Sequence, residues 1–353
     1  MAKIQLFVTR TIALMFPTMN LAMNILTMMI IWFGSFQVAS GNIQIGVMMA
    51  FVQYTMHVLM SFLIIAASFI VIPRASVSAV RIMAVLDAPL SITDPVEPQS
   101  FLPAHKGEVV FEQVFFRYPN AEEDTLSDIS FVAKPGETTA VIGGTGSGKS
   151  TLISLILRLH DVSDGQLLVN GTDVKDVKQH DLREKIGYIP QKAVLFSGTI
   201  DSNLRYGKEN ASRKEMKKAV EIAQAADVIA EKEAGYDEPI AQAGTNVSGG
   251  QKQRLSIARA LLKPADIFLF DDSFSALDFK TDAALRAALR QQLADKTIII
   301  VTQRIGTVMD AEQIIVLEDG KIVGKGTHQQ LLKNCEVYRE LALSQLSKKE
   351  LAL

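Results

Sequence analysis

Two long apolar runs set the first ninety residues apart from the rest of the chain. Residues 11–33 carry no charged side chain, and residues 47–72 carry only His57 as an ionisable group. A spanning helix needs roughly 20 apolar residues to cross a hydrocarbon core of about 30 Å. Both runs are long enough, so the pattern predicts two membrane-spanning helices within residues 1–86.

Basic residues flank this pair of runs, and the connector between them has no charge. Lys3 and Arg10 precede the first run, and Arg74 and Arg81 follow the second. Because basic residues mark the cytoplasmic side of a membrane protein, both ends of the hairpin are expected to be cytoplasmic. We therefore expect a multi-pass protein of the cytoplasmic membrane, in contact with membrane lipid.

A secretory signal peptide is the alternative interpretation of the first run. Basic residues precede it, and residues 38–40 resemble a cleavage site. The apolar core of a signal peptide is about 7–15 residues long. The run is longer than that and a second run follows directly, which favours the spanning helix.

Residues 87–106 contain four prolines and three acidic residues, which indicates a linker between two domains. The second domain is expected to start near Gly107 and to extend to residue 343, with residues 344–353 as a tail. Net charge is −2 and the sequence pI is about 6.2, so the composition does not indicate nucleic acid as a partner. The single cysteine, Cys335, excludes an internal disulfide framework and is expected to be a reduced cytosolic thiol.

The second domain contains a glycine-rich loop between a short β-branched strand, residues 138–143, and a helical apolar pattern, residues 152–159. Strand, loop and helix together form the phosphate-binding P-loop pattern. Backbone N–H groups and the helix N-terminus are expected to bind the phosphates, with Lys149 on the β- and γ-phosphates and Ser150 on Mg²⁺. The loop residues are Gly143, Gly144, Thr145, Gly146, Ser147, Gly148, Lys149, Ser150 and Thr151.

Further strands predict the sheet in which this loop lies. Residues 267–272 form a buried strand that ends in two carboxylates, and residues 297–301 form another. In a parallel sheet the carboxyl ends of the strands form the ligand-binding edge, so Asp271 is placed to meet the Mg²⁺. Asn-Gly at 170–171 and Asp-Gly at 319–320 predict hairpin turns. A mixed α/β domain with an antiparallel subsheet is therefore expected.

The segment VSGGQKQR, residues 247–254, lies between the P-loop and the paired carboxylates. It closely resembles the signature motif of ATP-binding cassette (ABC) proteins. Tyr118 matches the aromatic residue that stacks on adenine, Gln191 matches the Q-loop residue that senses Mg²⁺, and residues 275–278 match the D-loop. The resemblance covers residues 108–343 and implies an α/β P-loop NTPase with a helical subdomain that binds ATP and Mg²⁺.

The apolar hairpin upstream of this domain, with residues 196–200 after the Q-loop, looks like the exporter branch of the family. Six membrane helices precede each cassette in that branch, and two are expected here. The chain is therefore expected to be a C-terminal fragment of a longer gene product, or else the product of an internal start. The cargo is expected to be a small molecule, a lipid or a peptide. Met15, Met19 and Met23 share one helical face and suit an apolar ligand, although helix or lipid packing explains them better.

Cassettes of the family pair head to tail, with ATP between the P-loop of one and the signature of the other. The resemblance thus implies a second exporter subunit as the partner. It also implies that Gln191 and Asp271 join Ser150 at the Mg²⁺. The signature residues that would contact ATP on the partner are Ser248, Gly249, Gly250 and Gln251.

Two positions depart from the family pattern. Asp272 stands where the family has a glutamate that polarises the attacking water, and it is shorter by one C–C bond, about 1.5 Å. Gln303 stands where the family has a histidine on the γ-phosphate, and it carries no positive charge. Both substitutions together resemble the weakly hydrolysing subunit of a heterodimeric exporter, with a homodimer as the alternative. Asp272 and Gln303 are therefore the candidate catalytic residues.

Two other functions remain open at this stage. One is an ABC ATPase of the soluble type, which works on nucleic acid or ribosomes. The other is a regulatory subunit that binds nucleotide without hydrolysing it. One cassette joined to two apolar runs favours the exporter subunit, with its nucleotide-binding domain in the cytoplasm.

Overall fold

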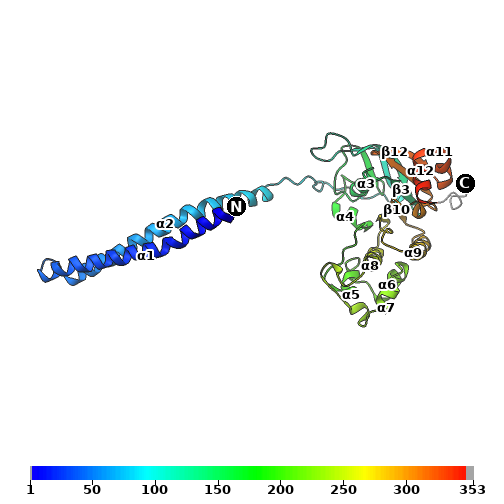
Figure 1. The fold of residues 1–353 in the computed structure, drawn as a ribbon. Helices are drawn as coiled ribbons and strands as arrows, with labels where there is room; N and C mark the ends of the chain where they lie inside the picture. The colour runs from blue at the N-terminus through cyan, green and yellow to red at the C-terminus, as the bar shows by residue number, and fades with distance from the viewer. Residues whose placement is uncertain (1, 347–353) are drawn as a thin grey trace. The chain divides into compact units, whose positions relative to one another are not determined.

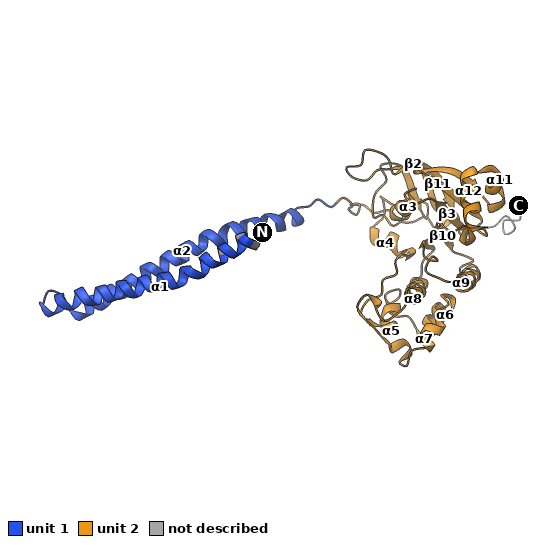
Figure 2. Cartoon of the chain, viewed as in Figure 1, with its two compact units in different colours: residues 1–90 blue, residues 91–353 orange. Residues whose placement is uncertain are grey.

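The computed structural model describes residues 2–346, which form two compact units (Figure 2). The first unit ends at Leu90 and the second begins at Ser91. Part of the predicted C-terminal tail, residues 347–353, lies outside the described residues.

Two long helices make up the first unit, α1 (Ala2–Ala39) and α2 (Ile45–Leu86). By length and composition both are apolar enough to cross a membrane. α1 extends past the uncharged run, and the Ser40 hydroxyl donates to the Phe36 carbonyl in its last turn. Gly41 follows in the left-handed conformation, with φ of 72°, and marks the end of this helix. The connector between the helices is therefore shorter than the sequence indicated.

A six-stranded sheet forms the centre of the second unit (Figure 1). All neighbouring strands pair in parallel except β11 and β12, which are antiparallel. This confirms the predicted mixed sheet and its buried strands. In spatial order the strands are β12 (Lys321–Gly326), β11 (Gln313–Glu318), β3 (Thr138–Gly143), β10 (Thr297–Thr302), β9 (Ile267–Asp271) and β6 (Ile186–Ile189).

The inner strands β11, β3, β10 and β9 are buried on both faces over most of their length, as their continuous apolar sequences require. Along β9, Ile267 and Leu269 pack into one core, and Phe268 and Phe270 pack into another on the opposite face. This alternation follows from the two-residue repeat of a strand. The flanking helices are α3 (Lys149–Ile156), α4 (Gln179–Glu184), α9 (Phe279–Gln292), α10 (Ile305–Val308), α11 (His328–Asn334) and α12 (Glu336–Gln345).

An antiparallel sheet covers part of the face of the central sheet that carries Ile267 and Leu269, in agreement with the predicted subsheet. Its strands, in spatial order, are β2 (Leu126–Ala133), β1 (Val109–Phe116), β4 (Asp164–Val169) and β5 (Thr172–Asp173). Asn170 and Gly171 both have positive φ in the β4–β5 turn, and so do Asp319 and Gly320 between β11 and β12. Both predicted hairpins are therefore present, with the backbone that Asn-Gly and Asp-Gly pairs favour.

A helical lobe follows β6 in the chain (Figure 1), and its apolar side chains share one core with Phe268 and Phe270 of β9. This lobe contains α5 (Ile200–Arg205), α6 (Arg213–Ile222), α7 (Ala226–Ala230), α8 (Gly249–Leu261) and the short pair β7 (Gly198–Thr199) and β8 (Pro239–Ile240). It corresponds to the helical subdomain that the family resemblance implied. Cys335, the single cysteine, is buried between α11 and α12.

Residues 91–106, the first part of the second unit, are held to the rest of that unit by a series of hydrogen bonds. Buried Arg158, at the carboxyl end of α3, donates to the carbonyls of Thr93 and Val177, each at 3.0 Å. The carboxylate of Asp94 accepts from the backbone N–H of Gln179 at 2.9 Å. The segment that enters this unit is thus bound to the end of the helix that begins in the P-loop.

We expect Arg158→Met to lower the free energy of unfolding by about 2–4 kcal/mol, because it leaves two backbone carbonyls and the carboxylate of Asp161 without their hydrogen-bond donor. Arg117→Met removes an exposed pair with Asp124 and should cost about 1 kcal/mol or less. Urea unfolding of the full chain, followed by circular dichroism, measures both. Equal losses would contradict the role assigned to Arg158.

Candidate nucleotide-binding site

The P-loop connects the carboxyl end of β3 to the first residue of α3, Lys149. Gly146 and Gly148 take positive φ, 85° and 97°, which glycine adopts without strain. A Cβ on Gly143 would lie 2.2 Å from the Leu317 carbonyl oxygen. A Cβ on Gly144 would meet no other described atom within 4 Å. The loop glycines therefore have two roles, since some allow close packing and others leave open space over the backbone.

Lys149 lies with its ammonium group inside this loop. Its Nζ donates to the carbonyl of Gly143 at 2.9 Å and to the carbonyl of Gly144. Burial lowers the pKa of Lys149, and the charges of Asp272 and Asp271 oppose that shift. A cation is thus held where the loop, the sheet edge and two carboxylates meet.

A polar cavity of about 280 Å³ lies over this meeting point. It brings together residues from β9, β10, the P-loop and the loop after β6. The lining residues are Thr125, Thr145, Gly146, Gly148, Lys149, Ser150, Thr151, Gln191, Asp271, Asp272, Val301, Thr302 and Gln303. Most of the P-loop residues, Gln191, both carboxylates and Gln303 are thus placed together.

Strand register explains why the carboxylates reach this cavity. Asp271 is the last residue of β9 and pairs with Val301 of β10. Thr302, the next residue of β10, pairs with Ile142 of β3. Burial raises the pKa of Asp271, and the neighbouring charge of Asp272 raises it further. The two adjacent carboxylates therefore gain from hydrogen-bond donors or a cation beside them.

Asp272 is held by donors on both carboxylate oxygens. Thr302 Oγ1 donates to Oδ1 at 3.1 Å, and Gln191 Nε2 donates to Oδ2 at 3.3 Å. Its backbone is left-handed, with φ of 44°, a conformation that aspartate tolerates better than most residues. Tyr188 of β6 lies near the other carboxylate, Asp271, and burial raises the pKa of Tyr188 to about 12, so its hydroxyl keeps its proton at neutral pH.

Gln303 follows β10 in a loop whose backbone is hydrogen-bonded to a side chain of the C-terminal helix α12. Gln345 Nε2 donates to the Gln303 carbonyl at 2.7 Å, and Gln345 Oε1 accepts from the Ile305 N–H at 2.9 Å. The backbone around Gln303 is thus fixed, and its side chain lines the cavity.

The donor set in this cavity fits a magnesium nucleotide. Ser150, Gln191 and Asp271 offer oxygen ligands, which Mg²⁺ prefers. The open backbone at Gly144 and Gly146 and the N-terminus of α3 suit phosphate oxygens. These residues fit both groups without rearrangement of the fold.

Tyr118, Gly143, Gly144 and Ser147 lie outside the cavity lining. Tyr118 lies beside α3, where its hydroxyl is 3.2 Å from Thr151 Oγ1, and Phe116 and His160 both contact its ring in edge-to-face geometry. The ring is 37% exposed, so an adenine has room to stack on it. Ser147 and Gly143 are buried in the turn of the loop.

The signature residues form a separate surface. Ser248 caps the N-terminus of α8, since its hydroxyl accepts from the Gln251 N–H at 3.2 Å and Gln251 Oε1 accepts from the Ser248 N–H at 3.0 Å. Gly249 is exposed, and Gly250 is half-buried. Among the described residues, the lining of the P-loop cavity does not include these four.

Thr125 and Thr302 line the cavity but were not among the predicted site residues. Thr302 directly follows the predicted buried strand 297–301, so its position at the sheet edge was a usable signal. Thr125 precedes β2 in a loop without a motif, and its place depends on how the two sheets pack.

The fold and the site define a P-loop nucleotide-binding domain. Residues 126–275 match the family model described as ABC transporter. An uncharacterized ABC transporter ATP-binding protein of Mycobacterium bovis is 46% identical over 336 residues, which cover 94% of this chain and 57% of that protein. The protein YfiB of Bacillus subtilis, with the same description, is 41% identical over 332 residues, with the same coverage of both chains.

A solved structure of a bacterial Atm1-family ABC exporter with ATP bound is also similar. The TM-score is 0.77 at 30% identity, and the match covers 93% of this chain and 57% of that chain. The chain thus spans a little over half the length of its relatives. It belongs to the ABC transporter family and carries the ATP-binding domain.

We expect Gly143→Ala to destabilise the second unit by about 2 kcal/mol or more, because its Cβ would meet the Leu317 carbonyl. Gly144→Ala, one residue on, places its Cβ in open space and should change the stability by less than about 1 kcal/mol. Thermal unfolding of the two variants checks this pair. A larger loss in the Gly144 variant would be inconsistent with the packing described here.

Proposed function

We propose that the chain is the ATP-binding part of an ABC exporter subunit in the cytoplasmic membrane. It would couple ATP binding and hydrolysis to the export of a small molecule, a lipid or a peptide. The observation that carries this proposal is the 280 Å³ cavity, where the P-loop, Gln191, Asp271 and Gln303 come together. We propose the domain arrangement expected from the sequence, with spans near residues 11–33 and 47–72, a linker at 87–106, a cassette at 107–343 and a tail at 344–353.

The two apolar helices support the membrane placement. Both lack a charged residue over most of their length, and their large apolar side chains are exposed within the unit. Exposed apolar surface of this extent is stable in lipid or against other apolar helices. The basic residues at both outer ends support a cytoplasmic position for the nucleotide-binding domain.

The full chain, expressed in bacteria, should stay in the membrane pellet after an alkaline carbonate wash. A chain that begins at Ser91, where the second compact unit starts, should move to the supernatant. Immunoblotting of both fractions measures this. Release of the full chain would favour the soluble type of ABC ATPase instead.

The roles that the family resemblance implies within the cassette are compatible with the geometry. The P-loop backbone and Lys149 would bind the phosphates of ATP, and Tyr118 would stack on the adenine. Ser150, Asp271 and Gln191 would hold Mg²⁺, which supplies positive charge against the phosphate oxygens. Ser248, Gly249, Gly250 and Gln251 would contact ATP bound to a second exporter subunit. Their exposure at a helix N-terminus, away from the P-loop cavity, supports a role between two chains.

The site formed around this P-loop is proposed to hydrolyse ATP weakly. Asp272 would have to accept a proton from the attacking water, and a general base must lie within about 3 Å of the proton donor. The aspartate side chain is shorter than that of glutamate, and its carboxylate already accepts hydrogen bonds from Thr302 and Gln191. Gln303 supplies no positive charge for the developing anion. A different subunit with an intact glutamate and histidine is therefore the favoured partner, and a homodimer is the alternative.

We expect Asp272→Glu combined with Gln303→His to raise ATP turnover by about 10²-fold, since a positioned base contributes about 10²–10⁴. The left-handed backbone at position 272 costs glutamate part of this gain. Phosphate release by the purified full chain measures the rate. Lys149→Ala added to the double variant should abolish the gain, which assigns it to this site.

Wild-type turnover in the range common for enzymes, roughly 1–10³ per second, would contradict a weak site. Absence of a gain in the double variant would do the same. If a partner subunit fails to stimulate turnover as well, the regulatory function, in which the chain only binds nucleotide, becomes the better description.

A further inference from the structure

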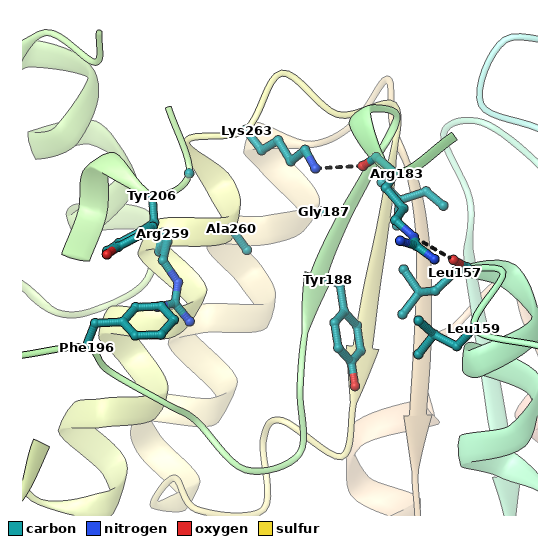
Figure 3. A pocket seen from close by; sticks show the side chains of 12 residues that line it. Leu157, Leu159, Arg183, Gly187, Tyr188, Phe196, Tyr206, Arg259, Ala260 and Lys263 are labelled. Carbon is teal, nitrogen blue, oxygen red and sulfur yellow. Dashed lines mark hydrogen bonds between the residues drawn. The ribbon is translucent and has the colours of Figure 1, made fainter. Parts of the chain in front are cut away.

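A second cavity, of about 440 Å³, lies between β6 and the helical lobe (Figure 3). Its wall on the sheet side includes Gly187 and Tyr188 of β6, and its wall on the lobe side includes Tyr206 and Arg259. Tyr188 is 36% exposed, with its ring along the cavity and its hydroxyl at the far end of the ring. This residue lines the second cavity and also reaches the nucleotide site.

The sheet register directs Tyr188 toward the magnesium carboxylate. β6 pairs in parallel with β9, and Tyr188 lies opposite Leu269. Asp271, two residues beyond Leu269, points to the same face, because strand side chains alternate. Tyr188 Oη lies 3.5 Å from Asp271 Oδ2 and donates a long hydrogen bond to it. The ring thus spans from the edge strand to the carboxyl end of the neighbouring strand.

We propose that Tyr188 is a positioning residue for the magnesium site, which fixes the carboxylate of Asp271 by donating to Oδ2. This inference rests on the proposed role of Asp271 in binding Mg²⁺. The donor occupies one carboxylate oxygen and leaves Oδ1 to the ion. Tyr188 itself touches neither the nucleotide nor the metal in this assignment, so its effect passes through Asp271 alone.

The charge arrangement explains why Asp271 needs such a donor. Asp271 is buried and lies beside a second carboxylate, Asp272, so its ionised form is disfavoured. Asp272 has two donors, Thr302 and Gln191. Tyr188 gives Asp271 a neutral donor, and the charge of Lys149 and the Ser150 side chain also favour the ionised form. A hydrogen bond to the charged form stabilises it and also limits its rotation.

Ring packing alone is the competing explanation for Tyr188. Tyr206 offers a matched control, because it lines the same cavity and is 66% exposed. Its ring packs on Phe196, with centroids 4.6 Å apart. Removal of the hydroxyl from each tyrosine therefore changes the same chemistry in the same cavity, with and without a contact to Asp271.

The test uses the full chain in detergent micelles, with Mn²⁺ as the probe of the metal site. The measured quantity is the factor by which Mn²⁺ tightens ATP binding relative to ATP in EDTA, from competition against a fluorescent ATP analogue. We expect Tyr188→Phe to reduce this factor about 3- to 10-fold, the range for loss of one hydrogen bond. ATP affinity in EDTA should not change, which also shows that the variant is folded. Tyr206→Phe should change neither quantity.

A double-mutant cycle with Asp271→Asn separates positioning from packing. If Tyr188 acts through the carboxylate, Tyr188→Phe has no further effect once Asp271 is replaced. An equal effect in both backgrounds overturns the proposal, and so does an unchanged factor in Tyr188→Phe alone. If Mn²⁺ does not tighten ATP binding to the wild-type chain, the metal role of Asp271 fails first. That outcome differs from failure of the Tyr188 assignment, where the wild-type chain still responds to Mn²⁺.

Discussion

Strands β3, β10 and β9 pair in parallel, and their carboxyl ends lie at one edge of the sheet. This register places the P-loop, Thr302 and Asp271 beside one another, although Asp271 lies 122 positions after Lys149 in the chain. A shift by one residue in either pairing would turn Asp271 to the opposite face, because side chains alternate along a strand. Every role assigned in the nucleotide site depends on this alignment. The apolar faces of β9, which pack into two separate cores, stabilise it.

The fold was largely predictable, because its strongest signals are local. The β-branched run before the P-loop and the run before Asp271 are too apolar to be anything but buried strands, and the two hairpin turns carry residues that accept positive φ. Element ends were less predictable. The first long helix continues past its apolar run to Ala39, because hydropathy reports where lipid is tolerated and not where helical hydrogen bonding stops. The contacts of residues 91–106 with the sheet domain were also missed, since a proline-rich composition indicates irregular backbone but not what that backbone packs against.

For the site, motif spacing predicted which side chains meet, and packing decided the rest. Lys149, Gln191, Asp271 and Gln303 line one cavity, as the resemblance implied. The donors on Asp272 and the approach of Tyr188 to Asp271 could not be predicted, because they arise from pairs thirty or more residues apart, in or just after different strands. Thr125 enters the cavity only because the antiparallel sheet packs over the central one. Specific hydrogen bonds of this kind decide how well a site works, and a sequence pattern does not encode them directly.

Arg158, just beyond the end of α3, connects this helix to the segment that enters the second unit. α3 has eight residues, so it is about 12 Å long, and a helix this short moves as a stiff rod. The first residue of α3 is Lys149, and just beyond its last turn Arg158 donates a hydrogen bond to the Thr93 carbonyl. The chain that enters the second unit and the phosphate-binding loop therefore contact opposite ends of one short helix. A displacement of either end of α3 is expected to shift the other, so the position of Thr93 and the occupancy of the loop are expected to depend on each other.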